Sequence, residues 1–386
     1  MRLLHTSDWH LGRSFHREGM LAHQAAFLDH LLEVVESEDV DLVVVSGDVY
    51  DRALPPVDAV ALFDDALVRL AASRARVVLT SGNHDSALRL GFSSRLIDAA
   101  GVHLRTDPAD VGAPVLLADE HGTVAVYGLP YLEPSLVAPL YGLEGPASRS
   151  HEAVLGEALR RVRADLAERP DGTRAVVMAH AFVAGAAPSE SERDISVGGV
   201  ARVPTTLFDD LHYVALGHLH GAHTLAPHLR YSGSPLAYSF SESEQTKGSW
   251  LVDLGADGVT EARFVPAPVP RPLARLRGTL EELLTAAEHE PATGAWVEAT
   301  LTDVVRPSQA MERLRGRFPH ALVLRFESTA APIGAPPGAP ARGRGDLEIA
   351  TEFVEALRGA PATDAEVALL QEAVDACCTA AAEAGR

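Results

Sequence analysis

DLVVVSGDVYD, residues 41–51, is an apolar run of strand length that ends in a polar cluster. Similar runs are LLHTSDWHLG (3–12), ARVVLTSGNHD (75–85), RAVVMAHAF (174–182) and HYVALGHLHG (212–221). Runs that are apolar at successive positions and rich in valine indicate strands buried on both faces. Helical patterns at 22–36 and 57–73 separate the first three runs. The amino-terminal part is therefore predicted to be a layered α/β domain.

Each of these five runs ends in polar residues that could form a site. The clusters contain Asp8 and His10, Asp48 and Asp51, Asn83 with His84 and Asp85, His180, and His218 with His220. Any single cluster is more typical of a turn or a helix cap than of a site. Because α/β sheets place their sites at the carboxyl ends of strands, however, the clusters together predict one shared site.

Seven of these residues are predicted metal ligands. The set offers two carboxylates, one amide oxygen and four histidines, a mixture that suits manganese or iron better than calcium or magnesium. Two Mn²⁺ ions are the predicted cofactor, with Mg²⁺ as the alternative, and they would activate water for attack on phosphorus. Asp48 is predicted to bridge the ions, Asp8, His10 and His220 to complete one, and Asn83, His180 and His218 to complete the other.

Three neighbouring residues are given roles beside the ions. His84 follows a predicted ligand and is predicted to be the catalytic proton donor or stabiliser for the leaving oxygen. A structural hydrogen-bonding role for His84 remains the alternative. Asp51 and Asp85 are predicted to orient histidines or loop backbone around the ligands.

Further segments follow the α/β domain. The predicted divisions are 1–265 for the α/β domain, 266–329 for a small α+β domain, 330–345 for a Pro/Gly/Ala linker and 346–386 for a helix pair. A capping box from Thr363 to Glu366 is predicted to start the second helix of that pair. Two short amphipathic helices after a flexible linker cannot bury their apolar faces alone, so they either fold back on the main body or dock on a partner.

The composition restricts the class of protein. The 386 residues include 33 basic and 53 acidic side chains, a net charge of −20, which argues against a protein that coats nucleic acid through a general positive field. A nucleic-acid enzyme remains compatible, because bound cations and a basic partner can supply positive potential. The adjacent Cys377 and Cys378 exclude a disulfide framework. With no long apolar run and no signal-peptide pattern, we expect a soluble cytoplasmic protein that does not bind membranes.

The motifs DWH, GDVYD, GNHD, AH and GHLH, in this order, resemble those of the calcineurin-like metallophosphoesterase superfamily. The longer stretches at 2–15, 189–221 and 231–242 are similar to the SbcD family of bacterial DNA-repair nucleases. This resemblance implies a metallophosphoesterase β-sandwich flanked by helices, with 266–329 as a capping domain. It also implies the same seven ligands and the same role for His84.

The resemblance to the SbcD family further implies an activity and partners. The activity would be ATP-dependent exonuclease action on double-stranded DNA ends and endonuclease action on single strands and hairpins, in DNA repair, recombination and replication. The protein would associate with the nucleoid. SbcC, an ATPase with a long coiled coil, would be gripped by the terminal helix pair, and the nuclease would form a homodimer within a heterotetramer.

Two other functions compete with this one. A small-molecule or cyclic-nucleotide phosphodiesterase of the same superfamily would have the same metal ligands but a different substrate. The capping domain and the helix pair argue against this alternative. A scaffold protein would retain the fold but act only by binding partners, without catalysis. The intact set of seven predicted ligands argues against this hypothesis.

Overall fold

The computed structural model describes residues 1–145, 148–193, 203–327, 345–358 and 360–384. Two compact units are formed, one from Met1–Arg275 with Gly294–Val297 and the other from Leu276–Thr293 with Glu298–Arg386. Apart from Gly345, the predicted linker lies outside the described residues. Among the residues described, no helix combines the length and the apolar character needed to cross a membrane.

The first sheet of the larger unit carries the strands with the first three motifs. Its strand order within the described chain is β14-β13-β1-β4-β5-β6. The parallel strands are β1 (Arg2–Thr6), β4 (Leu42–Ser46), β5 (Arg76–Thr80) and β6 (Val102–Arg105), and the antiparallel ones are β13 (Gly248–Gly255) and β14 (Gly258–Pro266). The strands predicted at residues 3–12, 41–51 and 75–85 are therefore confirmed.

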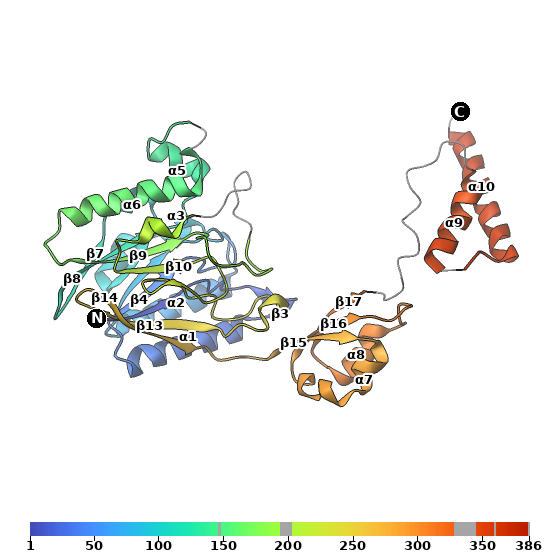
Figure 1. Cartoon of the computed structure of the whole chain (residues 1–386), viewed down its shortest axis with the longest axis horizontal. Helices are drawn as coiled ribbons and strands as arrows, with labels where there is room; N and C mark the ends of the chain where they lie inside the picture. Colours follow the sequence, from blue (N-terminus) through green and yellow to red (C-terminus); the bar gives the residue numbers. More distant parts are fainter. Residues whose placement is uncertain (146–147, 194–202, 328–344, 359, 385–386) are drawn as a thin grey trace. The chain divides into compact units, whose positions relative to one another are not determined.

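The second sheet carries the last two motifs. Its strand order, again among described residues, is β11-β12-β10-β9-β8-β7. Parallel pairing joins β8 (Gly122–Leu129), β9 (Arg174–His180), β10 (Tyr213–Gly217) and β12 (Leu229–Tyr231), while β7 (Val115–Asp119) and β11 (His223–Ala226) pair antiparallel. The two sheets are stacked as a sandwich (Figure 1).

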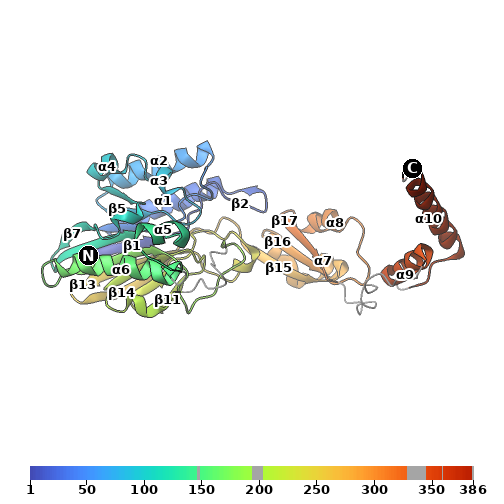
Figure 2. The same cartoon turned by 90° about the horizontal axis from the view of Figure 1, so that it is seen from above.

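Successive side chains of each strand point to opposite faces of its sheet, and this explains the layers of the fold. In β4, Leu42 and Val44 pack between the two sheets, whereas Val43 and Val45 face the helices. Helices α1 (Leu21–Ser37) and α2 (Val57–Ala72) cover the outer face of the first sheet, and α5 (Pro134–Leu140) and α6 (His151–Ala167) cover that of the second (Figure 2). Since both faces of the motif-bearing strands are buried, their apolar runs are nearly continuous. The predicted helices at 22–36 and 57–73 correspond to α1 and α2.

Short elements connect these layers. They are β2 (Ser14–Phe15), β3 (Glu18–Gly19), α3 (Ala87–Leu90), α4 (Ser94–Ile97), and the 3₁₀ turns Asp98–Ala100, Pro108–Asp110, Thr205–Phe208 and Phe240–Glu242. The loops that carry the polar clusters lie at the carboxyl ends of the strands, so the sandwich presents them at one edge.

The region after the sandwich alternates strand, helix, strand, helix and strand. The elements are β15 (Leu273–Gly278), α7 (Leu280–Thr285), the 3₁₀ turn Ala287–Ala292, β16 (Trp296–Leu301), α8 (Ala310–Arg317) and β17 (Ala321–Phe326), with sheet order β15-β16-β17. Helices α9 (Asp346–Arg358) and α10 (Asp364–Ala384) form the predicted pair and contact each other. The Thr363 backbone N–H donates to Glu366 Oε2 at 2.8 Å, as expected for the capping box.

His5 ties the two sheets together next to the motif-bearing loops. It lies in β1, and its Nδ1 accepts from the Tyr213 hydroxyl of β10 at 2.9 Å while its Nε2 donates to the Leu216 carbonyl at 3.1 Å. The imidazole is fully buried. Burial lowers the pKa of His5 to about 3, so the folded protein holds this ring neutral.

This burial predicts a pH-dependent loss of stability that a His5→Gln variant lacks. In the unfolded chain the imidazole takes up a proton below its ordinary pKa of 6.5, whereas the folded chain does so only near pH 3. The stability advantage of the parent over the variant should therefore be constant above pH 7 and fall by about 1.4 kcal/mol per pH unit below about pH 6. Urea unfolding of both metal-free chains between pH 7.5 and 5 measures this difference. Parallel stability curves would contradict it.

Candidate metal centre

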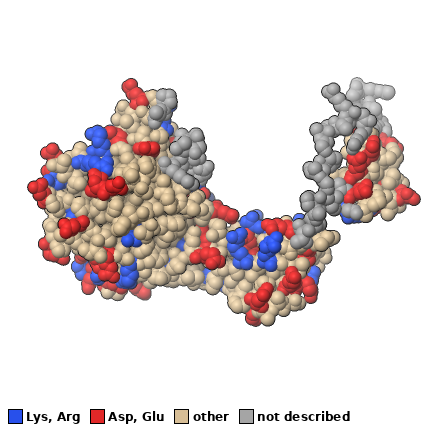
Figure 3. Space-filling model, viewed as in Figure 1, with Lys and Arg blue, Asp and Glu red and all other residues tan. Residues whose placement is uncertain are grey.

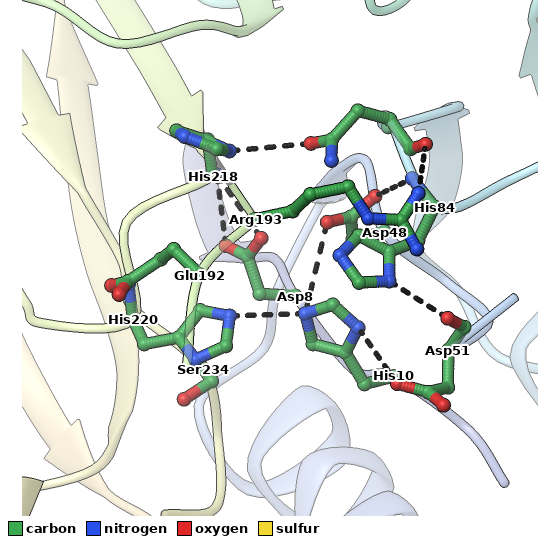
Figure 4. Close-up of polar contacts among 12 residues, drawn as sticks. Asp8, His10, Asp48, Asp51, His84, Glu192, Arg193, His218, His220 and Ser234 are labelled. Atoms are coloured by element: carbon green, nitrogen blue, oxygen red, sulfur yellow. Dashed lines mark hydrogen bonds and ion pairs between the residues drawn. The ribbon is translucent and has the colours of Figure 1, made fainter. Parts of the chain in front are cut away.

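The predicted site residues come together where strands of both sheets end. Asp8 and His10 follow β1, Asp48 follows β4, Asn83 and His84 follow β5, His180 ends β9, and His218 and His220 follow β10. Figure 4 shows the labelled side chains among these residues pointing toward one another. All of them except Asn83 are buried, and Asn83 is half-buried. The structure thus gathers every predicted ligand in one place, although their binding of metal stays a prediction.

The residues expected to hold one ion form a tight group. One potential ligand atom from each of Asp8, His10 and His220 lies within 4.8 Å of the others. The Nε2 atoms of His10 and His220 are 3.0 Å apart. Asp48 Oδ2 lies 3.7 Å from His10 Nε2, so the predicted bridging carboxylate adjoins this group.

The residues expected to hold the second ion also adjoin Asp48. Asn83 Oδ1 lies 2.9 Å from His180 Nε2 and 3.2 Å from His218 Nδ1. His180 Nε2 lies 3.4 Å from Asp48 Oδ2. Asp48 therefore contacts both predicted groups, which is the position that a bridging ligand requires.

The electrostatics of this cluster fit divalent cations. Burial raises the pKa of Asp8 to about 6. Burial alone would raise the pKa of Asp48 and lower that of His180. The attraction between the carboxylate and the imidazolium outweighs burial, so the pKa of Asp48 lies well below its usual value and that of His180 is raised to about 9. Two buried carboxylates thus require nearby positive charge, which bound cations supply.

The donor set of the cluster also fits divalent ions. Its carboxylate, amide and imidazole groups are the ligand types of a transition-metal site.

The backbone of the site is strained where ligands are presented. Asp8, His10, Asp48 and His218 have φ of 54°, 46°, 48° and 104°, in or near the left-handed region that such residues seldom adopt. Gly47 also has a positive φ, at 85°, and this lets the backbone turn sharply before Asp48. Gly82 has an ordinary φ, and glycine is required there for a different reason. A Cβ at this position would overlap the Asp48 carboxylate.

His84 faces the cluster from beside Asp48. Its ring Nδ1 donates to the Asp51 carbonyl at 2.7 Å, which leaves Nε2 for the centre. Its backbone N–H donates to Asp48 Oδ1 at 2.8 Å. Burial lowers the pKa of His84. Because Nδ1 donates to Asp51, Nε2 carries a proton to give only in the imidazolium form, so the predicted proton-donor role requires that form. The backbone contact shows that His84 also helps to fix the Asp48 carboxylate.

Asp51 and Asp85 act on their surroundings in different ways. Asp51 orients His84 through its main-chain carbonyl, and its carboxylate lies 3.7 Å from Arg13 Nε. The Asp85 carboxylate accepts from the backbone N–H groups of Gly82, Val49 and Tyr50 at 2.9–3.1 Å. It therefore joins the β4 and β5 loops through their backbone, as one of the predicted roles describes.

The sequence patterns did not identify several residues that contact the predicted ligands through hydrogen bonds or ion pairs. Gln24 Nε2 donates to the His10 carbonyl at 2.8 Å and to the Tyr238 hydroxyl at 3.0 Å. Ser191, Glu192, Glu242 and Lys247 surround His220. These residues lie outside the five motifs. Only the stretches at 189–221 and 231–242 could have drawn attention to Ser191, Glu192 and Glu242.

Comparison with known proteins assigns the family. The model of the calcineurin-like phosphoesterase family matches residues 1–222, and that of the type 5 capsule protein repressor C-terminal domain matches residues 269–356. The chain is 31% identical over 327 residues to the SbcD subunit of the nuclease SbcCD from Staphylococcus saprophyticus, covering 84% of each chain. The chain belongs to the SbcD family. Its fold class and its activity as a metal-dependent phosphodiesterase are thereby confirmed.

Solved structures show weaker likenesses to this SbcD-family protein. A protein of Thermus thermophilus has a TM-score of 0.40 and 14% identity, covering 68% of this chain and 98% of that one. A novel archaeal phosphodiesterase has a TM-score of 0.30 and 13% identity, covering 69% of this chain and 99% of that one.

Proposed function

We propose that this chain is the nuclease subunit of an SbcCD-type complex that uses two Mn²⁺ ions to cleave DNA. The proposed activities are ATP-dependent exonuclease action on double-stranded ends and endonuclease action on single strands and hairpins, in DNA repair, recombination and replication. The observation that carries this proposal is the gathering of all seven predicted ligands around Asp48 in a member of the SbcD family.

The residues of the centre would divide the work of phosphodiester hydrolysis. Asp48 would contact both ions, with Asp8, His10 and His220 on one and Asn83, His180 and His218 on the other. The ions supply positive charge and activate water for attack on phosphorus. His84, held through Nδ1 by Asp51, would present Nε2 to the leaving oxygen and, as an imidazolium with a second proton on Nε2, would stabilise or protonate it.

Basic side chains outside the centre support a DNA substrate. In the three-stranded sheet, β15 exposes Arg275 and Arg277, and β17 exposes Arg325. Figure 3 shows basic side chains gathered on the part of the chain that contains this sheet. Such side chains can contact phosphates locally even though the net charge is −20.

A comparison of two variants tests the proposed chemistry. Asp48→Ala should abolish both Mn²⁺ binding and DNA cleavage, because it removes the shared carboxylate. His84→Ala should keep Mn²⁺ binding but slow cleavage by about 10²–10⁴-fold, the usual contribution of a general acid. Calorimetric Mn²⁺ titration and digestion of linear duplex and hairpin DNA measure the two effects.

Controls separate this nuclease from other phosphodiesterases. His121→Ala, at an exposed histidine in the turn between β7 and β8, should behave as the parent. Cleavage of DNA at the parental rate by His84→Ala would contradict the proposed role. Efficient turnover of a cyclic dinucleotide with none of DNA would instead favour the small-molecule phosphodiesterase.

An exposed apolar patch supports the proposed homodimer. Leu88, Phe92 and Leu96, on and beside α3 and α4, are 87%, 79% and 78% exposed. Phe92 also lines a groove of about 580 Å³ together with Leu54 and Val60. Exposed apolar patches of this kind mark protein interfaces, and a two-fold dimer would bury the same patch on both copies.

Phe92→Asp should convert the proposed dimer into a monomer without unfolding it, because Phe92 is largely exposed and the charge would be buried only at the interface. Sedimentation velocity of the parent and the variant measures this change. Leu136→Asp, at a side chain of α5 that is 74% exposed, is the matched control and should remain dimeric. A parent that is monomeric at micromolar concentration would contradict the homodimer.

The terminal helices support the proposed ATPase partner. On α9, Leu347, Ala350 and Val354 recur at helical spacing and are half-buried. Ile349 and Phe353, one turn apart on α9, remain 38% and 54% exposed. We propose that they contact the base of the SbcC-type coiled coil, as apolar anchors at i and i+4 do in helix-mediated recognition.

Phe353→Asp should therefore abolish co-purification with the ATPase when both are co-expressed, because it places a charge in an apolar interface. Cleavage of single-stranded DNA by the isolated chain should be unchanged. The control Glu355→Ala, at an exposed position of the same helix, should retain the ATPase. Retention of the ATPase by Phe353→Asp would contradict this docking surface.

A further inference from the structure

We propose that Ser191 and Glu242 are positioning residues for His220. They would fix the tautomer of its imidazole so that Nε2 offers a lone pair to the metal centre. This inference rests on the proposed function, because it takes His220 as a ligand. Neither residue reaches the reacting atoms; both would act through the histidine.

The hydrogen bonds behind His220 determine the tautomer. Ser191 Oγ donates to Glu242 Oε1, and the same oxygen lies 2.5 Å from His220 Nδ1. A hydroxyl carries a single proton, and an ionised carboxylate only accepts. The Ser191 oxygen must therefore accept from Nδ1–H of His220. A neutral imidazole has one ring proton, so Nε2 is left without one.

The unprotonated Nε2 points toward the predicted ligands. It lies 3.0 Å from His10 Nε2, in the group that also contains Asp8. Nitrogen ligands at about 2.1 Å from a common ion, as in zinc sites, and at right angles would be about this far apart. The tautomer set by Ser191 is therefore the one that a metal ligand in this position needs.

Charge pairing holds the Glu242 carboxylate in place. Lys247 Nζ lies 2.5 Å from Glu242 Oε2 and also donates to the His220 carbonyl at 2.8 Å. Glu242 and Lys247 are 1% and 9% exposed. A buried ion pair with further hydrogen bonds is rigid. The Glu242 carboxylate therefore keeps a fixed orientation as the acceptor for the Ser191 hydroxyl.

Ser191 itself is held by neighbouring contacts. Arg13 Nη2 donates to the Ser191 carbonyl at 2.8 Å. The next residue, Glu192, accepts from the His220 backbone N–H at 2.7 Å. The segment therefore contacts both the ring and the backbone of His220, and these contacts hold the Ser191 hydroxyl beside Nδ1.

The competing explanation is that Glu242 only neutralises the buried Lys247 and that Ser191 only adds stability. A hydroxyl with a comparable hydrogen bond but no contact with this network separates the two explanations. Thr173 is buried and directly precedes β9, and its hydroxyl donates to the Pro170 carbonyl at 2.7 Å. Thr173→Val is therefore matched to Ser191→Ala in burial and in the loss of a hydroxyl hydrogen bond.

The experiment measures metal affinity, stability and tautomer in the full-length chain. Electron paramagnetic resonance of free Mn²⁺ gives the affinity, and urea unfolding without metal gives the stability. We expect Ser191→Ala to weaken Mn²⁺ binding by about 10–100-fold, as removal of a partner behind a metal-bound histidine commonly does. Thr173→Val should lower stability to a similar degree and leave Mn²⁺ affinity unchanged.

Nitrogen-15 spectra of histidine-labelled, metal-free protein report the tautomer directly, with His220→Gln identifying the resonance. The parent should carry the proton on Nδ1, and Ser191→Ala should show a mixture of tautomers. Parental Mn²⁺ affinity in Ser191→Ala, or a parent ring protonated only at Nε2, would overturn the inference while leaving the proposed nuclease intact. A parent that binds no Mn²⁺ would overturn both.

Discussion

The carboxylate of Asp48 connects the two sheets at the centre, and the positions of the other site residues depend on it. Asp48 follows β4 of the first sheet, and its Oδ2 lies 3.4 Å from His180 Nε2 of the second. Its Oδ1 accepts from the backbone of His84, which places the β5 loop. Gly82 leaves the space that this carboxylate occupies. A shift of Asp48 would therefore move parts of both predicted metal groups together.

The sequence was sufficient to predict this convergence because its signals are local. Each motif-bearing strand is buried on both faces, so it reads as an apolar run, and each ends in polar residues that a core would not tolerate. Knowing that strand ends share an edge then groups Asp8, Asp48 and His218 without any structure. The fold class follows from the same runs and from the helices between them.

The residues behind the ligands could not be predicted in this way, because their roles depend on contacts between distant segments. Gln24 lies in α1 and looks like an ordinary helix residue, yet it is buried against the His10 carbonyl. Glu242 and Lys247 resemble solvated charges in a serine-rich loop, although the fold buries both. Periodicity reports which face of an element is apolar, and it does not report which polar side chain will be enclosed there.

The metal centre lowers the stability of the folded chain when no ions are bound. Left-handed backbone at Asp8, His10, Asp48 and His218 costs on the order of 1–3 kcal/mol per residue, and burial of two carboxylates adds to it. The apolar layers between the sheets and beneath the helices must offset these terms in the absence of ions. Cations that bind the folded chain would recover part of the electrostatic cost, so metal binding and stability are coupled. Four of the nine described non-glycine residues with positive φ are predicted ligands, and strain held at a site by the surrounding fold is a feature of preorganised catalytic centres.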